Sequence, residues 1–115
     1  MSDIGGSVGV RQVAHLHQIS VIVLATGGEP SLRSTLAGLG DSASPVVVID
    51  CVDVGPLPER DRDAILDAHR GLEKDRRRLI VVNAAAEDIG ILAKNGLELA
   101  ETIDHVFRDA PADTD

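Results

Sequence analysis

Three apolar runs in the middle of the chain have the composition of buried strands: residues 19–25, 45–52 and 79–83. They are rich in valine and isoleucine and are bounded by glycine, proline or charged residues, which is typical of strands covered on both faces. Residues 8–17 alternate apolar and polar side chains less regularly and predict a further strand. Residues 97–107 fit a strand or a helix.

Apolar residues at helical spacing predict three helices between these strands. The first begins at Pro30, a favourable first helical position, and ends before Gly40. The second covers residues 59–74 as a surface helix with charged residues on its opposite side. The third covers residues 86–95 and ends at Gly96 in a left-handed cap. The apolar positions of the first two helices are Leu32, Leu36, Leu39, Ile65, Ala68 and Leu72.

The order of these elements predicts an α/β fold, because strands that alternate with helices through short links form parallel β-α-β units. A chain of 115 residues has room for a single domain. We expect a mixed sheet of about four or five strands, with helices packed against it, within residues 8–107. Residues 1–7 are small and polar, residues 108–115 include several acidic side chains, and both are expected to be loose tails.

Composition narrows the classes of partner. The chain carries 19 acidic and 11 basic side chains, a formal net charge of -8, so nucleic acids and anionic membranes are not expected to bind. Phe107 is the only aromatic residue, which disfavours stacking on bases or sugars. The single cysteine, Cys51, excludes an internal disulfide, and no leader or membrane-spanning run is seen. We therefore expect a cytoplasmic protein.

Few residues have the spacing of a metal or catalytic site. His15 and His17 share one face of a strand but make only half a metal site, and His69 and His105 lie in other elements. Cys51 lies in or beside an apolar strand, where a thiol is usually inert packing. No metal, cofactor or enzymatic activity is expected from these residues.

Two acidic residues, Asp50 and Asp53, follow the central strand, where open α/β sheets usually carry function. The proline turn after Asp53 invites comparison with a response-regulator receiver, whose phosphorylated aspartate precedes such a turn. A receiver also needs an acidic pair after its first strand and a lysine after its last. Residues 22–26 contain no acid, and Asn83 stands where the lysine would be. A degenerate receiver-like phosphoacceptor at Asp53 is kept as an alternative.

A longer pattern joins several of these elements. A buried strand that ends in an aspartate is followed by a hydrophobic turn, a helix, another strand and a helix with a glycine at its end. The segments concerned are residues 46–50, Val54 and Leu57, residues 64–72, residues 78–83 and residues 91–97. This order resembles the STAS family, named for sulfate transporters and anti-sigma factor antagonists, over residues 19–107. The resemblance implies a STAS-like domain.

The chain departs from that family at the phosphorylation motif. Members of the family begin the helix with Asp-Ser-Ser/Thr-Gly, and a partner kinase modifies a hydroxyl there. Residues 58–61, Pro-Glu-Arg-Asp, occupy the motif here, so Glu59 is the phosphosite equivalent. A phosphoserine carries about -1.5 to -2 charge and a glutamate about -1, so Glu59 would partly imitate the modified state. Alternatively, Glu59 is an ordinary acidic residue of a first helical turn. Asp61 is interpreted as an N-cap that delays the helix start to Arg62.

The resemblance implies a noncatalytic protein-binding module of bacterial signalling and transcription regulation. The expected partner is an anti-sigma factor or a kinase-like signalling protein, and the chain itself is expected to be a monomer or a weak homodimer. The implied contact surface is the end and outer face of the second helix, with a neighbouring loop. Its residues are Glu29, Pro58, Glu59, Arg60, Asp61, Arg62, Asp63 and Asp67.

Two questions stay open at this point. One of Ser31, Ser34 and Thr35 could replace the missing phosphosite, since these hydroxyls follow the loop near Glu29. A small ligand could also bind, as some STAS domains are thought to act as sensors.

Overall fold

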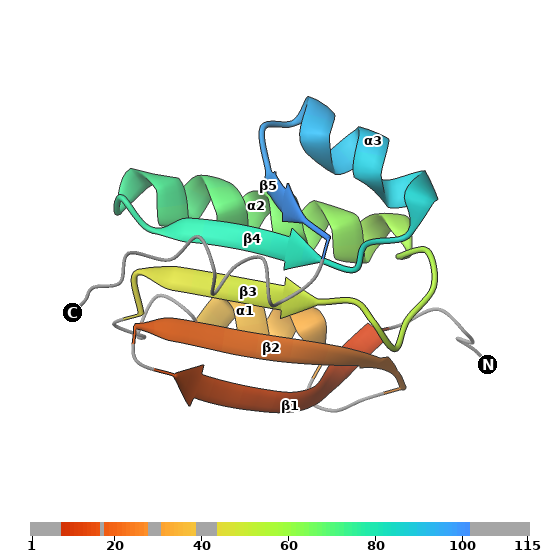
Figure 1. The fold of residues 1–115 in the computed structure, drawn as a ribbon, viewed down its shortest axis with the longest axis horizontal. Helices are drawn as coiled ribbons and strands as arrows, with labels where there is room; N and C mark the ends of the chain where they lie inside the picture. Colours follow the sequence, from red (N-terminus) through yellow and green to blue (C-terminus); the bar gives the residue numbers. More distant parts are fainter. Residues whose placement is uncertain (1–7, 17, 28–30, 39–43, 102–115) are drawn as a thin grey trace.

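The structure of the protein, a computed structural model, describes residues 8–16, 18–27, 31–38 and 44–101. These residues form five strands and three helices (Figure 1). The strands are β1 (Val8–Leu16), β2 (Ile19–Thr26), β3 (Val46–Asp50), β4 (Arg78–Val82) and β5 (Glu98–Ala100). The helices are α1 (Leu32–Ala37), α2 (Glu59–Lys74) and α3 (Ala86–Lys94).

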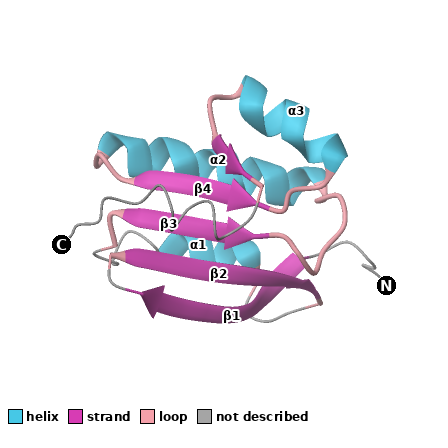
Figure 2. Cartoon of the chain, viewed as in Figure 1, coloured by secondary structure: helices cyan, strands magenta, loops and turns pink. Residues whose placement is uncertain are grey.

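The five strands make one mixed sheet in the order β1-β2-β3-β4-β5. The pair β1–β2 is antiparallel, whereas β2, β3, β4 and β5 run parallel to one another. Each parallel step carries one helix as its crossover, and α1 and α2 lie on the same face of the sheet (Figure 2). The predicted α/β class and the mixed sheet with packed helices are confirmed.

The core explains why the central strands are apolar without interruption. Side chains of a strand alternate between the two faces of a sheet. Val47 and Ile49 therefore face the helices and pack in the main core cluster with Ile65 and Leu92. Val48 belongs to a second buried cluster. Because both sets are buried, neither face of β3 requires polar residues.

No helix among the described residues is long and apolar enough to cross a membrane.

The apolar and polar residues of β1 alternate irregularly in the sequence for a physical reason. It lies at the edge of the sheet, and its register against β2 shifts between Val10 and Gln12. A bulge of this kind moves the later side chains out of strict alternation. Val13, after the bulge, is 44% exposed although it is apolar.

Two helix starts differ from the predictions. Ser31 caps α1, and its side chain accepts a hydrogen bond from the Ser34 backbone N–H, so the first helical residue is Leu32 and not Pro30. The predicted N-cap at Asp61 is wrong, because α2 already begins at Glu59 after Pro58.

The end of the chain is described only in part. Of the segment that fitted a strand or a helix, Glu98–Ala100 is a strand that pairs with β4. Gly96 has a φ of 85° after α3, as the left-handed cap requires. The proposed tails, residues 1–7 and 108–115, lie outside the described residues, as do residues 102–107.

Asp61 is buried, and its side chain connects two elements that are far apart in the sequence. Its side chain is only 3% exposed, and its carboxylate accepts a hydrogen bond of 3.2 Å from the backbone N–H of Val8. Burial raises the pKa of Asp61, although the Val8 N–H and the charge of Arg60 act in the opposite direction. The first turn of α2 is thereby attached to the first residue of β1.

We expect Asp61→Ala to lower the free energy of unfolding by about 1–3 kcal/mol, because the buried Val8 N–H loses its acceptor. Asp61→Asn should cost less at neutral pH, since the amide keeps an acceptor oxygen and carries no charge. The raised pKa means that ionised Asp61 is less favourable in the folded state than in the unfolded chain. The contribution of Asp61 to stability therefore falls as the pH rises through the folded pKa. Urea titrations of both variants between about pH 4 and pH 7 check this.

An equal loss of stability in both variants, or a wild-type advantage over Asp61→Asn that grows with rising pH, would contradict this role of Asp61. Matching urea slopes for all three proteins would show that the comparison concerns the native state and not a change in compactness.

Cys51 lies directly after β3 and is 1% exposed, inside the main core cluster. Burial raises the pKa of this thiol to about 12, and the charges of Asp50 and Asp88 act in the same direction. The thiolate is the reactive form of cysteine, so Cys51 is held in its unreactive state. The sequence-based interpretation of Cys51 as packing agrees with this position.

We expect the native protein to react with a thiol-modifying disulfide reagent at pH 8 at least about 100-fold more slowly than the protein in denaturant. The absorbance of the released thiolate measures both rates. Reaction of the folded protein at the rate of an exposed cysteine would disprove the buried position.

Candidate partner-binding site

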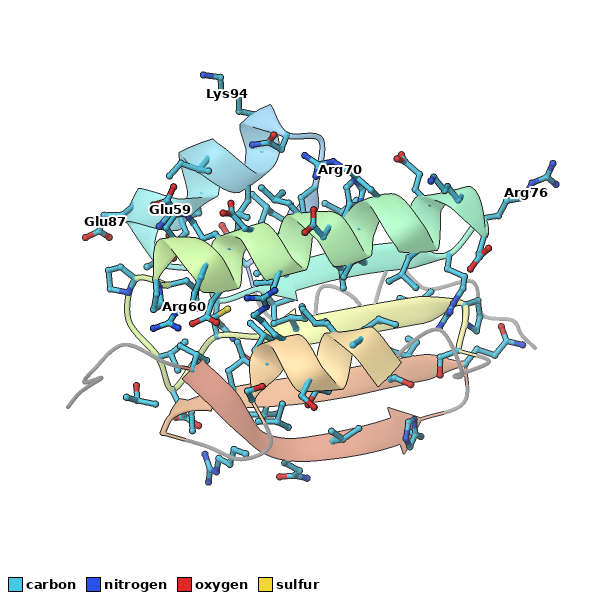
Figure 3. All side chains as sticks on the ribbon, turned by 180° about the vertical axis from the view of Figure 1, so that it is seen from behind. Glu59, Arg60, Arg70, Arg76, Glu87 and Lys94 are labelled. Carbon is cyan, nitrogen blue, oxygen red and sulfur yellow. The ribbon has the colours of Figure 1, made fainter. Side chains whose placement is uncertain are left out.

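The residues predicted to contact a partner gather at the N-terminal end of α2, directly after the loop that follows β3. Glu59, Arg60, Asp63 and Asp67 are exposed, while Ile65 of the same helix is fully buried. Residues four positions apart lie on one face of a helix, so Glu59, Asp63 and Asp67 form a row along its outer side. Glu59 and Arg60 project from the end of the helix (Figure 3). These four exposed residues are called the α2 surface below.

A buried carboxylate fixes the chain just before the α2 surface. Asp88, in the first turn of α3, is 1% exposed, and its side chain accepts a hydrogen bond of 2.9 Å from the backbone N–H of Leu57. The guanidinium of Arg62 donates to the Leu57 carbonyl at 2.8 Å and lies 3.4 Å from the other oxygen of Asp88. Both backbone groups of Leu57 are thus held by side chains of two different helices.

The structure removes two predicted residues from the exposed surface. Asp61 is buried against β1, as described above. The side chain of Arg62 is 22% exposed and is directed to Leu57 and Asp88, so it positions the loop instead of presenting a free charge. Pro58 is half-buried at the N-cap position. Glu29 lies outside the described residues.

Further along α2, the carboxylate of Asp67 accepts a hydrogen bond from Arg70 at 3.0 Å, and both side chains are exposed. An exposed pair of this kind contributes little to stability. The α2 surface therefore carries both signs of charge through Arg60 and its three acidic residues, and Arg70 lies beside it, further along the helix (Figure 3).

Asp50 and Asp53, the two acidic residues that follow the central strand in the sequence, lie at the end of β3. Their carboxylates make contacts with different residues. Asp50 accepts hydrogen bonds from the Val52 backbone N–H and from the Asn83 side chain at 2.9 Å. Asp53 pairs with Arg11 of β1. Among the residues that the structure describes, no group of three or more histidine, cysteine or acidic side chains could hold a metal ion. The carboxylate of Asp53 is thus engaged by an arginine of the neighbouring edge strand.

Of the four histidines, His15 is bonded to a hydroxyl: its Nδ1 lies 2.8 Å from the Oγ of Ser20. Ser20 is buried and also contacts the side chain of Ser44. His69 lies on α2, whereas His17 and His105 are outside the described residues. The predicted face shared by His15 and His17 is therefore untested.

Sequence reasoning missed Asp88, which supports the site most directly. Its partners Leu57 and Arg62 are 31 and 26 positions away, so no local motif identifies it. In the sequence it is one of two acidic residues in the first turn of a helix, where acids are common in any case. Only its burial distinguishes it from its neighbour Glu87.

No family model matches the chain, and no curated protein matches it. Several solved structures share its fold, among them the following two. An anti-sigma factor antagonist from Mycobacterium paratuberculosis superposes with a TM-score of 0.73 and 18% identity, over 93% of this chain and 97% of that one. The protein TM1081, determined by NMR, superposes with a TM-score of 0.69 and 8% identity, over 84% of this chain and 85% of that one. The chain therefore has the STAS fold of anti-sigma factor antagonists, as its sequence resemblance predicts.

Proposed function

We propose that this chain is a noncatalytic regulatory protein of the bacterial cytoplasm that binds an anti-sigma factor or a related kinase-like signalling protein. The α2 surface is the proposed contact. The observation that supports this most is the exposed row of Glu59, Asp63 and Asp67, with Arg60, at the end of a helix on a fold shared with an antagonist.

The support beneath this surface favours a binding role. Leu57 is held on both sides by Asp88 and Arg62, and Asp61 attaches the first helical turn to β1. A surface that is rigid before binding loses less conformational entropy when a partner docks. Exposed charges of both signs give orientation and specificity to such a contact more than raw affinity.

Glu59 makes the proposed contact independent of phosphorylation at this position. It is the first residue of α2 and has no hydroxyl to modify. Its negative charge is favourable at a helix N-terminus, where the backbone N–H groups point outward. We infer that the charge which a kinase adds in relatives with a serine is permanent here, although smaller than that of a phosphate.

Reversal of charge on the α2 surface should weaken partner binding by about tenfold. The variants are Glu59→Lys and Arg60→Glu, tested by biolayer interferometry against purified candidate anti-sigma factors of the source organism. Matched controls reverse the same charges at the other end of the helix: Glu73→Lys and Lys74→Glu, both at exposed positions. The controls should bind like the wild type, because net charge changes equally in both pairs. If all four variants weakened partner binding equally, the contact would lie elsewhere, or the charges would act only through long-range attraction.

A second prediction concerns phosphorylation at position 59, the phosphosite equivalent. With magnesium ATP and a kinase-type anti-sigma factor, the wild-type chain should gain no phosphate at position 59, whereas Glu59→Ser should be phosphorylated there. Peptide mass spectrometry locates the phosphate. Phosphate on Ser31, Ser34 or Thr35 of the wild type would show that one of these hydroxyls replaces the missing site and would contradict a permanent charge as the only signal.

A further inference from the structure

The sheet has a second buried face, to which the described helices contribute no apolar residue. The buried apolar side chains of α1, α2 and α3 all belong to the main core cluster. The second cluster consists of strand residues alone: Ile19, Val21, Val48, Ile80 and Val82. In Figure 2, α1 and α2 lie behind the strands, and the view looks onto this second face.

The second face is nevertheless closed to water. Val48 and Val82 are each 0% exposed. Side chains stand roughly perpendicular to a sheet whose strands are about 4.8 Å apart. Neighbouring strands therefore shield the flanks of such a side chain but not its outer end. A further apolar layer is needed to close this face, and the described helices do not supply it.

One segment outside the described ranges has the sequence of such a layer. In residues 102–110, Ile103, Val106, Phe107 and Ala110 recur at the spacing i, i+3, i+4, i+7, and the residues between them are polar or charged. This pattern is typical of an amphipathic helix with one apolar side. The other stretches outside the described ranges each contain at most two large apolar residues.

The place where this segment begins, and its length, fit the second face. The carbonyl of Glu101 accepts a hydrogen bond of 3.3 Å from the backbone N–H of Asn83, directly after β4. The chain therefore leaves the sheet next to Val82 and Ala100, which are part of the second cluster or pack against it. A helix of nine residues is about 13 Å long, and the distance across the sheet from β5 to β2 is about 14 Å.

We propose that the second face is a docking surface for residues 102–110 of the same chain, which lie across it as an amphipathic helix. The apolar side of this helix, with Phe107 as its largest side chain, contacts Val48 and Val82. While this cover is in place, neither a partner nor a second copy of the chain can dock on the second face. The proposal concerns the side of the sheet opposite to α2 and does not depend on the proposed function.

Nuclear Overhauser effects of the Phe107 ring test the cover in the intact chain. Phe107 is the only phenylalanine, tyrosine or tryptophan of the sequence, so its ring protons are assigned without ambiguity. They should show contacts with methyl groups of the second cluster, such as those of Val48 and Val82. Contacts with the main core cluster instead, for example with Ile65, or no contact with any methyl group of the sheet, would overturn the proposal.

Two substitutions in the segment form a matched pair. Phe107→Asp and His105→Asp each add one negative charge, on opposite sides of the expected helix. Phe107→Asp should lower the melting temperature by about 10 °C or more and raise the fluorescence of an apolar dye such as ANS, because the second face is opened to water. His105→Asp should behave like the wild type in both measurements.

A wild-type melting temperature and dye response in Phe107→Asp, or equal shifts in both variants, would contradict the cover. Phe107→Ala adds no charge and should give the same changes to a smaller extent, so it keeps the comparison possible if Phe107→Asp does not fold. A dye response of Phe107→Ala equal to that of the wild type would likewise count against the proposal.

Discussion

The geometry of this protein depends on one buried carboxylate, Asp88. It has almost no contact with water, and it satisfies the N–H of Leu57 while Arg62 satisfies the carbonyl of the same residue. A buried charge without partners is costly, whereas one that is paired and hydrogen-bonded fixes the groups around it. Through this contact α3 determines where the chain turns into α2.

Asp61 acts in the same way on the other side of the helix start, where its carboxylate accepts a hydrogen bond from the Val8 N–H. The two carboxylates hold the first turn of α2 between β1 and α3, and the exposed charges of the α2 surface rest on this support. In this protein the buried acids are structural and the exposed ones are available to a partner. The sequence alone does not separate the two kinds, because Glu59, Asp61 and Asp63 all fall within five residues.

Most of the fold could be predicted from the sequence, because burial of both sheet faces leaves long apolar runs at β2, β3 and β4. The bounds 59–74 that the apolar stripe predicts for α2 agree with the structure, whereas the later start implied by an N-cap at Asp61 does not. The site could be predicted only in part. The exposed row on α2 follows from helical spacing, but the inward orientation of Asp61 depends on Val8, 53 positions away. Contacts over such distances leave no local pattern, so the role of Asp88 emerges only from the packed structure.

Hydrogen exchange of the Leu57 amide, followed residue by residue by NMR, tests the role of Asp88 most directly. If the carboxylate holds this N–H away from water, it should exchange as slowly as the amides of β3 in the core of the sheet. Exchange at the rate of an unprotected loop amide would show that the turn before α2 is not fixed, and that the α2 surface has no rigid support.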